Sequence, residues 1–374
     1  MSRFGHNLSL TIFGQSHAAA IGVTIDGLPA GEAVDLADLQ AFLDRRAPGQ
    51  NRMTTQRREP DVPEILCGLL DGYTCGAPLT AVIRNTDTRS KDYRAIADKP
   101  RPSHADWPAE VRYRGWQDVR GGGAFSARLT APVCIAGGIA LQILARRGIR
   151  VAAHIRSIGG AEDRAFDPMG EPADVLDARL TRPLTVLSDA AADAMAAEIE
   201  AARKAADSVG GTIECMVTGL PVGLGGPLFD GIDGRLAQAV FGIPGIKGIE
   251  FGAGFEAARL RGSDNNDPWG LAENGVVVPL TNRAGGVAGG MTTGAPLLFT
   301  CVLKPTPSIG RTQQTISIAN HAPAELRVTG RHDPCIVVRA TPIVEAVAAL
   351  TVLDALLDAP ALLSDTPSKS KDLS

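Results

Sequence analysis

Aromatic residues make up only 4% of this sequence, and its basic residues are mostly arginine rather than lysine. The formal net charge is −4 and the pI is about 5.9, so the chain carries no excess of positive charge. Binding to nucleic acid or to an anionic membrane surface generally depends on such an excess. The composition therefore predicts a protein with neither kind of partner.

Cysteine is also sparse, and no C-x-x-C pair is present. The six cysteines are Cys67, Cys75, Cys134, Cys215, Cys301 and Cys335. Most lie in apolar runs, and no secretory leader precedes them, so we interpret them as reduced core residues. No run of 18 uninterrupted apolar residues occurs, so we expect no membrane-spanning helix and a cytoplasmic location.

Several catalytic and nucleotide-binding motifs are missing. No GK[ST] closes a phosphate loop, and no clean G-x-G-x-x-G follows a predicted strand, which argues against ATP-binding and Rossmann sites. The sequence also lacks H-E-x-x-H, a G-x-S-x-G elbow and a cysteine–histidine spacing suited to zinc. We therefore expect neither a metal site nor acyl-enzyme chemistry.

Glycine and proline are abundant, with 42 and 25 residues, and 44% of the 374 residues are hydrophobic. This composition predicts a large core with short strands and many shaped loops. Caps and periodicity predict four helices. The first spans 36–46 after Asp35, and the second spans 189–207 after Ser188 and is closed by Gly210 and Gly211. The third is a segment following Ser126, and the fourth spans 342–358 and is opened by Thr341 and Pro342.

Two segments resemble each other. Residues 23–43 and 215–241 both run from a strand through Gly-Leu-Pro-x-Gly and an acidic spacer into an amphipathic helix. This echo favours an internal pseudo-repeat, although chance similarity around the turn is an alternative. Because no polar linker separates the halves, we predict one domain over residues 1–358, with a loose tail at 359–374.

Two histidines lie in unusual loops. His17 is in "FGQSHAAAIG", among small residues, and His104 is in "RPSHADWP", between two prolines. Histidine is the usual acid and base near neutral pH, so the pair could share proton transfer, with a structural role as the alternative for each. Arginines gather in several loops, and surface solvation or ion pairing to Glu59, Asp61 and Asp333 is the alternative explanation for each. If the arginines converge, they form a cationic pocket, and the glycine-rich stretches 120–126 and 283–294 offer backbone N–H groups to an anion.

These loops belong to a series of ten sequence segments that are spread over nearly the whole chain. They are "FGQSHAAAIG", "DRRAPGQNRMTTQRREPD", "IRNTDTRSKDY", "RPSHADWP", "RGGGAFSAR", "GLPVGLGGPLFD", "KGIEFGAGF", "NRAGGVAGGMTTG", "LKPTPSI" and "GRHDPCIVVRATPIVEA". In this order they resemble chorismate synthase from about residue 3 to residue 358. That family, a lyase of the shikimate pathway in aromatic amino acid biosynthesis, converts 5-enolpyruvylshikimate 3-phosphate to chorismate by a 1,4-elimination of phosphate. It uses reduced FMN without net redox change.

The resemblance implies a fold and an assembly. The fold is α+β, with a helical layer sandwiched between two antiparallel β-sheets, and the assembly is a homotetramer. Because no reductase domain is appended, an external flavin reductase is also implied. NADPH is a possible electron source.

The resemblance also implies residue roles. In catalysis, His17 corresponds to the proton donor at the leaving phosphate, His104 to the group that protonates the reduced flavin, and Asp333 to an aid to proton removal. The implied substrate-binding residues are Ser16, Arg46, Arg52, Arg101, Arg128 and Arg331, with Arg46 and Arg52 also linked to NADP. The implied flavin-binding residues are Ala124, Phe125, Ser126, Pro244, Gly245, Gly289, Lys304, Pro305, Thr306, Pro307, Ser308 and Arg331.

The sequence departs from the family pattern on the cofactor side. Ala124, Phe125 and Ser126 stand where the family has Arg-Ser-Ser, and Pro244-Gly245 stands where it often has Asn-Ala. Gln15 and Ala18 replace the usual Glu and Gly of the first histidine motif. Two alternatives follow: a divergent paralogue with weak or no FMN binding and another substrate, or a non-catalytic binder of anionic metabolites.

Overall fold

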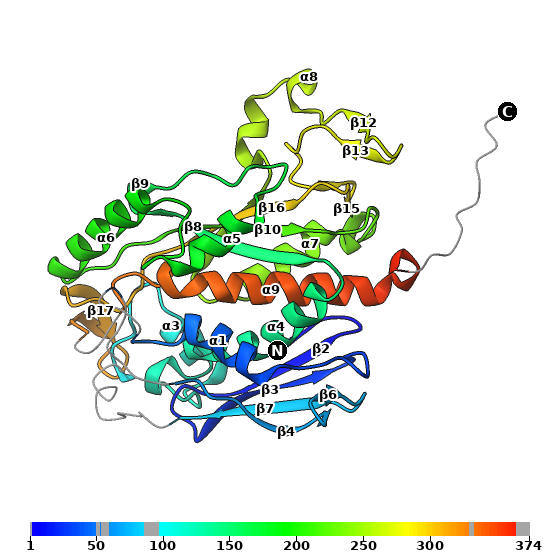
Figure 1. Ribbon diagram of the computed structural model, residues 1–374. Helices are drawn as coiled ribbons and strands as arrows, with labels where there is room; N and C mark the ends of the chain where they lie inside the picture. The colour runs from blue at the N-terminus through cyan, green and yellow to red at the C-terminus, as the bar shows by residue number, and fades with distance from the viewer. Residues whose placement is uncertain (1, 50–52, 54–59, 86–96, 329–332, 364–374) are drawn as a thin grey trace.

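The computed structural model describes residues 2–49, 53, 60–85, 97–328 and 333–363. Two five-stranded sheets, antiparallel throughout, enclose a layer of helices (Figure 1). The first sheet has the order β1-β2-β3-β7-β4, formed by Arg3–Phe4, Ser9–Gly14, Ala20–Asp26, Leu79–Arg84 and Glu64–Cys67. The second has the order β11-β16-β10-β8-β9, formed by Ile246–Phe251, Leu297–Leu303, Gly211–Thr218, Arg150–Ile158 and Ala161–Glu162. The predicted α+β sandwich is confirmed.

Four helices form the layer between the sheets, and the other elements lie around it. The four are α1 (Leu36–Arg46), α4 (Thr130–Ala145), α7 (Ile232–Phe241) and α9 (Val337–Asp358). The remaining helices are α3 (Asp106–Tyr113), α5 (Ala173–Ala178), α6 (Asp189–Lys204) and α8 (Gly262–Asn265). The two-stranded hairpins are β5–β6 (Leu69–Leu70, Tyr73–Thr74), β12–β13 (Trp269–Leu271, Val277–Pro279), β14–β15 (Val287–Ala288, Met291–Thr292) and β17–β18 (Gln313–Ser317, Ala322–Leu326). The 3-10 turns are η2 (Arg120–Phe125), η3 (Ala127–Leu129), η4 (Arg179–Thr181), η5 (Leu228–Asp230), η6 (Gly254–Arg259) and η7 (Pro360–Leu363).

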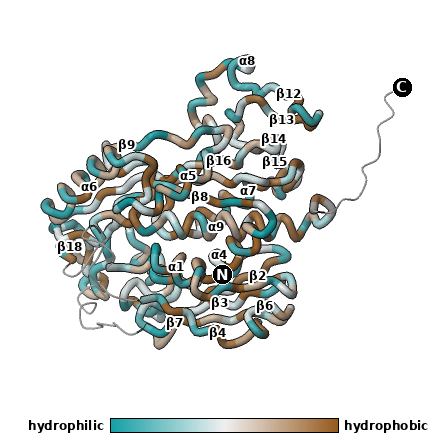
Figure 2. The backbone as a smooth tube through the Cα atoms, viewed as in Figure 1, coloured by the Kyte–Doolittle hydropathy of each residue, from teal (hydrophilic) through white to brown (hydrophobic). Residues whose placement is uncertain are grey.

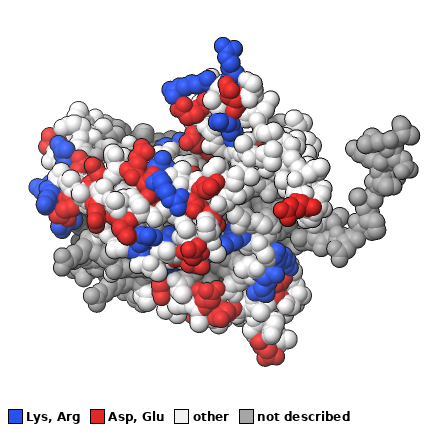
Figure 3. Space-filling model, turned by 45° about the horizontal axis from the view of Figure 1, so that its top comes forward, with Lys and Arg blue, Asp and Glu red and all other residues white. Residues whose placement is uncertain are grey.

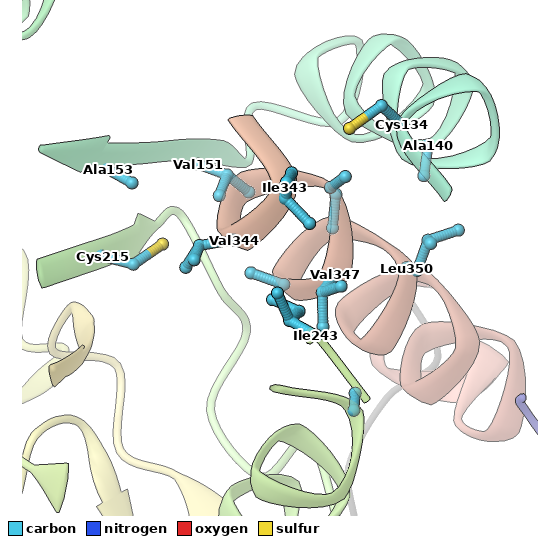
Figure 4. Close-up of a cluster of buried hydrophobic side chains, with 14 of the residues drawn as sticks. Cys134, Ala140, Val151, Ala153, Cys215, Ile243, Ile343, Val344, Val347 and Leu350 are labelled. Carbon is cyan, nitrogen blue, oxygen red and sulfur yellow. The ribbon is translucent and has the colours of Figure 1, made fainter. Parts of the chain in front are cut away.

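The core lies where α4 and α9 meet. Helix α4 packs on the first sheet and α9 on the second, and the two helices pack on each other. A Cβ on Gly137 would collide with Ala346, so glycine there allows the two helix backbones to approach closely. Figure 4 shows the centre of this contact, where α9 meets α4, two strands of the second sheet and the end of α7, through Cys134, Ala140, Val151, Ala153, Cys215, Ile243, Ile343, Val344, Val347 and Leu350.

Two helical segments are long and apolar enough to cross a membrane. They are Ala127–Ala145 and Val337–Asp358, and 78% and 94% of their apolar windows are buried inside the protein. Figure 2 shows them as hydrophobic segments in the middle of the sandwich. Their apolar surface is therefore used by the core. On the face shown in Figure 3, acidic and basic side chains are interspersed rather than separated.

The two halves of the chain repeat one topology, as the sequence echo predicted. The order β2-β3-α1-β4-β7-α4 in the first half returns as β8-β10-α7-β11-β16-α9 in the second. The strands also pair in the same way, because β3 lies between β2 and β7 as β10 lies between β8 and β16. The core helices α4 and α9 are therefore equivalent elements.

The Gly-Leu-Pro-x-Gly turn has the same contacts in both halves. Gly27 and Gly219 follow β3 and β10 with φ of +88° and +79°. A Cβ on either glycine would collide with a backbone carbonyl oxygen just before the neighbouring strand, that of Asn7 or that of Gly148. Only glycine fits such a position, which explains why a glycine occurs at this point in both turns.

A second pair of equivalent turns escaped the sequence analysis. The Thr74 hydroxyl donates to the Pro29 carbonyl at 2.5 Å, and the Thr292 hydroxyl donates to the Pro221 carbonyl at 2.5 Å. Both threonines are buried and open the segment Thr-x-Gly-Ala-Pro-Leu that leads into β7 or β16. The repeat thus covers the hairpins β5–β6 and β14–β15 as well.

Two predicted helix ends are wrong. Helix α9 begins at Val337, and Pro342 lies inside it. An internal proline gives up one backbone hydrogen bond, but the buried Val337 and Ala340 continue the apolar face beyond it. Helix α6 ends at Lys204, because Ala206 adopts a left-handed conformation with φ of +53° before Gly210 is reached.

The cysteine prediction holds for four residues and fails for two. Cys134, Cys215, Cys301 and Cys335 are buried, and burial raises the pKa of the Cys134, Cys301 and Cys335 thiols to about 12. Cys67 and Cys75 are exposed. They lie at the edge strand β4 and just after β6, where the chain is not covered by the helical layer.

Candidate active site

A glycine bend forms the centre of the candidate site. Gly121, Gly122 and Gly123 have φ of +61°, +83° and +53°, three consecutive values that favour glycine. The Ser16 N–H, just beyond β2, donates to the Gly123 carbonyl at 3.2 Å. A Cβ on Gly121 would collide with the His17 ring, so the bend and the first histidine loop pack directly together.

The second histidine contacts the next glycine of this bend. A Cβ on Gly122 would lie 3.4 Å from Cε1 and Nε2 of His104. His17 is 8% exposed, and the His104 side chain is 16% exposed. The structure therefore brings the two predicted histidines to neighbouring positions of one backbone segment.

Asp106 fixes the orientation of His104. Its Oδ1 lies 2.6 Å from His104 Nδ1, and its oxygens accept from Arg101 Nε at 2.8 Å and from Arg101 Nη2 at 2.9 Å. Burial raises the pKa of this carboxyl, but the hydrogen bonds and charges of Arg101 and His104 outweigh burial and hold it well below its ordinary value. A carboxylate on Nδ1 leaves Nε2 on the side of Gly122.

Asp106 is absent from the predicted site, although a signal was present. It follows His104 by two residues in the quoted loop. A helix also begins at this residue, so its carboxylate lies in the first turn of α3. This position both suits a negative charge and directs the side chain back to the loop.

Two of the predicted substrate arginines meet at one buried aspartate. Arg46, at the end of α1, places Nη1 2.5 Å from Asp61 Oδ2, and Arg128 Nη1 bonds Asp61 Oδ1. The two guanidinium side chains are each 4% exposed. Asp61 was not among the predicted site residues; the sequence, with an acidic residue beside an arginine-rich stretch, indicated it only as an ion-pair partner.

The loop after β16 joins this region to the predicted flavin residues. Lys304 N–H donates to the Gly245 carbonyl at 2.9 Å, and Arg101 Nη1 donates to the Ser308 hydroxyl at 3.2 Å. The Thr306 hydroxyl donates to the Asp333 carbonyl at 3.0 Å. Pro305 and Pro307 lie in the same loop, and Pro244 precedes Gly245.

Lys304 has features of an anion site. Burial, and secondarily the charge of Lys247, lower the pKa of its ammonium group. Its Nζ donates to the Ser103 carbonyl in the loop of His104. A partly buried ammonium group is suited to binding an anion.

Asp333 forms an ion pair with Arg339 of α9. Its side chain is 9% exposed. Burial is the main cause that lowers the pKa of Arg339, and the charge of Arg46 acts in the same direction. Arg45, next to Arg46, pairs with Glu345 of α9 at 2.7 Å, so the first turns of α9 lie beside the end of α1.

The three residues that depart from the family pattern follow the glycine bend. Ala124 is exposed, and Phe125 is 40% exposed with its ring 6.3 Å from that of Tyr113. The Ser126 hydroxyl accepts from the Arg128 N–H at 3.3 Å and so caps η3. Ser126 thereby helps to place Arg128.

Gly289 lies away from the other residues. It occupies the turn of the hairpin β14–β15, equivalent to Asp71 in β5–β6, and Figure 1 shows β15 at the opposite side of the molecule from α3. The structure therefore does not bring Gly289 to the glycine bend within this chain. Arg52 and Arg331 lie outside the described residues.

Most of these groups come from equivalent ends of the two halves. The first half contributes the loops after β2 and β7, the end of α1 and the start of α4. The second contributes the loop after β16, the residue pair after α7 and the start of α9. Figure 1 shows the α9 start on the same side as α3 and the β17–β18 hairpin. The arrangement provides cations held by carboxylates, two imidazoles and a glycine-rich backbone, which are groups suited to binding an anion.

Comparison with known proteins gives a consistent result. The sequence profile of a family described as "Chorismate synthase" matches residues 8–357. A protein named chorismate synthase from Thermococcus gammatolerans is 46% identical over 353 residues, covering 94% of this chain and 97% of the relative. One from Korarchaeum cryptofilum is 43% identical over 354 residues, covering 95% of this chain and 97% of the relative.

A solved structure agrees with the sequence relatives. A crystal structure of chorismate synthase superposes with a TM-score of 0.74 at 26% identity, covering 95% of this chain and 93% of the other. The match spans both sheets and the helical layer, since it covers nearly all of both chains.

Proposed function

Because the chain belongs to the chorismate synthase family, we propose that it converts 5-enolpyruvylshikimate 3-phosphate to chorismate by 1,4-elimination of phosphate. The observation that carries the proposal is the glycine bend, which contacts His17 through Gly121 and His104 through Gly122. Arg101 also reaches Gly122, and Arg128 follows the bend in the chain; both are of the type that binds phosphate and carboxylate groups.

Arginines 46, 101 and 128 are proposed to bind the anionic groups of the substrate. When the carbon–oxygen bond breaks, negative charge develops on the phosphate oxygen, and guanidinium groups already in place stabilise that charge without reorganising. Arg46 and Arg128 are buried, so their charge is weakly screened by water. Ser16, itself buried beside His17, is proposed to complete the phosphate contacts.

His17 is proposed to donate a proton to the departing phosphate. His104 is proposed to hold a proton at Nε2, on the side of the glycine bend, because its Nδ1 faces Asp106. Asp333 is proposed to aid proton removal from the substrate, and its ion pair with Arg339 keeps the carboxylate in place. These steps use only groups that reach the same region.

The residues that would hold reduced FMN lie beside this region. Lys304, with its pKa lowered by burial and by Lys247, fits the phosphate of FMN, and the loop 304–308, Pro244-Gly245 and residues 124–126 would frame the ring. Reduced FMN would supply electron density to the reacting ring without net redox change. Gly289 would take part only from another copy of the chain, which agrees with the proposed homotetramer.

The cofactor supply and the location follow from the same proposal. An external flavin reductase or another source of reduced flavin is needed, and NADPH is a candidate electron source through Arg46 and Arg52. We expect the protein to work in the cytoplasm on a small-molecule substrate. Light scattering on the purified protein measures its oligomeric state, and a monomer would contradict the tetramer.

An activity assay tests the function. Purified protein with substrate and chemically reduced FMN under anaerobic conditions is expected to form chorismate, followed by its ultraviolet absorbance and by phosphate release. His17→Ala and His104→Ala are expected to lower turnover by about 100-fold or more, because general acid–base groups commonly contribute that much. Substrate binding should change little in both variants.

The assay also separates the alternatives. A divergent paralogue would bind the substrate without binding FMN or forming chorismate, and a non-catalytic binder would bind it with no turnover. No observation on the described residues favours either alternative. Chorismate formation by the parent protein would exclude both.

A further inference from the structure

One carboxylate serves both buried arginines of the proposed substrate site. Asp61 is 1% exposed, and its two oxygens divide between the two guanidiniums, Oδ2 to Arg46 and Oδ1 to Arg128. Burial by itself raises the pKa of Asp61, but the charges and hydrogen bonds of Arg46 and Arg128 outweigh it and lower the pKa. The carboxylate therefore stays ionised, and the three side chains carry one net positive charge.

The two arginines are also held from their other sides. Arg46 Nε donates to the Thr130 hydroxyl at 3.2 Å and Nη2 donates to the Ala127 carbonyl at 3.2 Å. Arg128 Nε donates to the Asn85 side-chain oxygen at 3.4 Å. The guanidinium groups are thus held by three separate segments, residues 61, 85 and 127–130, and Asp61 bonds both of them.

The backbone at Asp61 is unusual as well. Its φ is +50°, a left-handed value that is strained for a residue with a Cβ. Asp and Asn adopt this region more readily than other residues with a Cβ. The chain therefore accepts a strained backbone at the point where this carboxylate is inserted between two arginines.

A buried aspartate elsewhere shows what a purely structural role looks like. Asp354 of α9 is also 1% exposed and pairs with Arg235 at 2.6 Å. However, it accepts the backbone N–H groups of His6, Asn7 and Leu8, so it ties a chain end to the core. Within the described part of the chain, the Asp61 oxygens bond guanidinium groups instead.

We propose that Asp61 is a positioning residue that holds the guanidiniums of Arg46 and Arg128 side by side as one preorganised surface for the anionic groups of the substrate. The inference rests on the proposed function, which assigns both arginines to the substrate. Without the carboxylate, two like charges in a buried site repel each other, and each would have to be ordered when the substrate binds. Asp61 removes this cost before the substrate arrives.

The test is a binding measurement on flavin-free protein. Isothermal titration with 5-enolpyruvylshikimate 3-phosphate compares the wild type with Asp61→Asn, which keeps the size and the favourable backbone preference but removes the charge. The dissociation constant is expected to rise about tenfold or more, as loss of charge-assisted hydrogen bonds implies. A dissociation constant within about twofold of the wild type, in a folded variant, overturns the proposal.

Asp354→Asn is the matched control. It removes an equally buried carboxylate from an arginine, so it is expected to lower the melting temperature. Its substrate dissociation constant should stay within about twofold of the wild type. If Asp354→Asn weakens binding as much as Asp61→Asn does, the effect is a general loss of stability and the positioning role is wrong.

A second variant covers the case in which Asp61→Asn does not fold. Asp61→Asn combined with Arg128→Gln leaves one net positive charge, as in the wild type, and is compared with Arg128→Gln alone. Because Arg46 still depends on Asp61, the double variant is expected to bind the substrate several-fold more weakly than the single one. Equal dissociation constants for the two overturn the proposal.

The single arginine variants separate the two hypotheses. If Arg46→Gln and Arg128→Gln both leave substrate binding unchanged, the assignment of these arginines in the proposed function is wrong, and Asp61 has no role in binding. If they weaken binding while Asp61→Asn does not, the assignment stands and only the positioning role fails.

Discussion

Aspartates hold the cations of this site in place. Asp61 holds Arg46 and Arg128, Asp106 holds Arg101 and His104, and Asp333 pairs with Arg339. Fixed cations stabilise developing charge best when they need not move during the reaction. Asp61 and Asp106 are therefore proposed to contribute by preorganisation rather than by contact with the substrate, whereas Asp333 is also proposed to aid proton removal. At the scale of single residues, the proposed electrostatics of the site therefore depend on Asp61 and Asp106, which contact the cations and not the substrate.

Asp106→Asn tests this view for the second histidine. Asparagine removes the charge that pairs with Arg101 and weakens the acceptor of His104 Nδ1. We expect kcat to fall by about 100-fold, within the range that positioned acid–base groups contribute, with a smaller change in KM. Steady-state kinetics with reduced FMN measures both constants.

The control is another aspartate beside a histidine. Asp163 lies 3.6 Å from His154 Nδ1, and both side chains are fully buried, on the second sheet. Asp163→Asn should lower the stability of the protein and leave kcat near that of the wild type. A kcat for Asp106→Asn within about threefold of the wild type would show that this carboxylate does not position His104.

The glycine bend is the element on which the site depends. Its three positive φ values place a bare backbone against His17 on one side and His104 on the other. A bend with side chains would fill the space between the two rings. The glycines of "RGGG" therefore matter because they have no Cβ. A substitution that adds one methyl group measures how much stability and activity depend on this.

Gly122→Ala adds that methyl group at a φ of +83°, 3.4 Å from the His104 ring and 3.6 Å from Arg101 Nη2. The strained backbone should cost roughly 1–2 kcal/mol of stability. The crowding of His104 should in addition lower kcat/KM by about tenfold or more. Denaturant unfolding and steady-state kinetics measure the two effects separately.

Gly31→Ala is the control that separates the effect of backbone strain from the effect of crowding the His104 ring. Gly31 has the same φ of +83°, and a Cβ there would meet nothing within 4 Å. This variant should lose a similar amount of stability and keep its kcat/KM. Equal kinetic losses in the two variants would mean that the bend affects activity only through stability.

The sequence predicted best those helix ends that are determined by neighbouring residues, and it predicted poorly those features that depend on contacts between residues far apart in the chain. Helix α1 and the start of α6 were predicted correctly, because Asp35 and Ser188 cap them through adjacent amides. The start of α9 was missed, since burial of Val337 against distant elements outweighs the local preference of Pro342 for a first turn. Asp61 was named only as an alternative ion-pair partner of the arginines, and its joint pairing with Arg46 and Arg128 was not predicted, because these partners lie 15 and 67 residues away along the chain.

At the scale of the whole molecule, the repeated topology explains why the site lies where it does. The two halves bring the same ends of equivalent helices, α4 and α9, to the site. The residue types there differ, since the first half supplies most of the described arginines and the histidines, and the second supplies the lysine and proline loop. The family resemblance predicted the site residues, whereas the sequence echo predicted only that two halves exist.

The sandwich also decides which thiols can react. Under native conditions, a thiol reagent is expected to label Cys67 and Cys75, which are exposed, and to spare the four buried cysteines, whose thiolates are disfavoured by burial. Mass spectrometry after limited alkylation identifies the sites, and denatured protein serves as the fully labelled control. Rapid native labelling of Cys134 or Cys301 would show that the helical layer opens readily.

Acid stability depends on a buried charge cluster on the second sheet. Burial by itself raises the pKa of Asp163, but the His154 imidazole 3.6 Å away and hydrogen bonds from the Leu187 N–H and the Ser188 hydroxyl outweigh it and lower the pKa from 3.8 to about 2. Since the folded pKa lies below the unfolded one, the stabilisation is present above pH 3.8 and is lost as the pH falls from 3.8 to about 2. Asp163→Asn, which does not titrate, should be less stable than the wild type above this window and should lose less free energy of unfolding across it. Denaturant unfolding at several pH values measures both, and parallel losses in the two proteins would show that other carboxylates cause the acid transition.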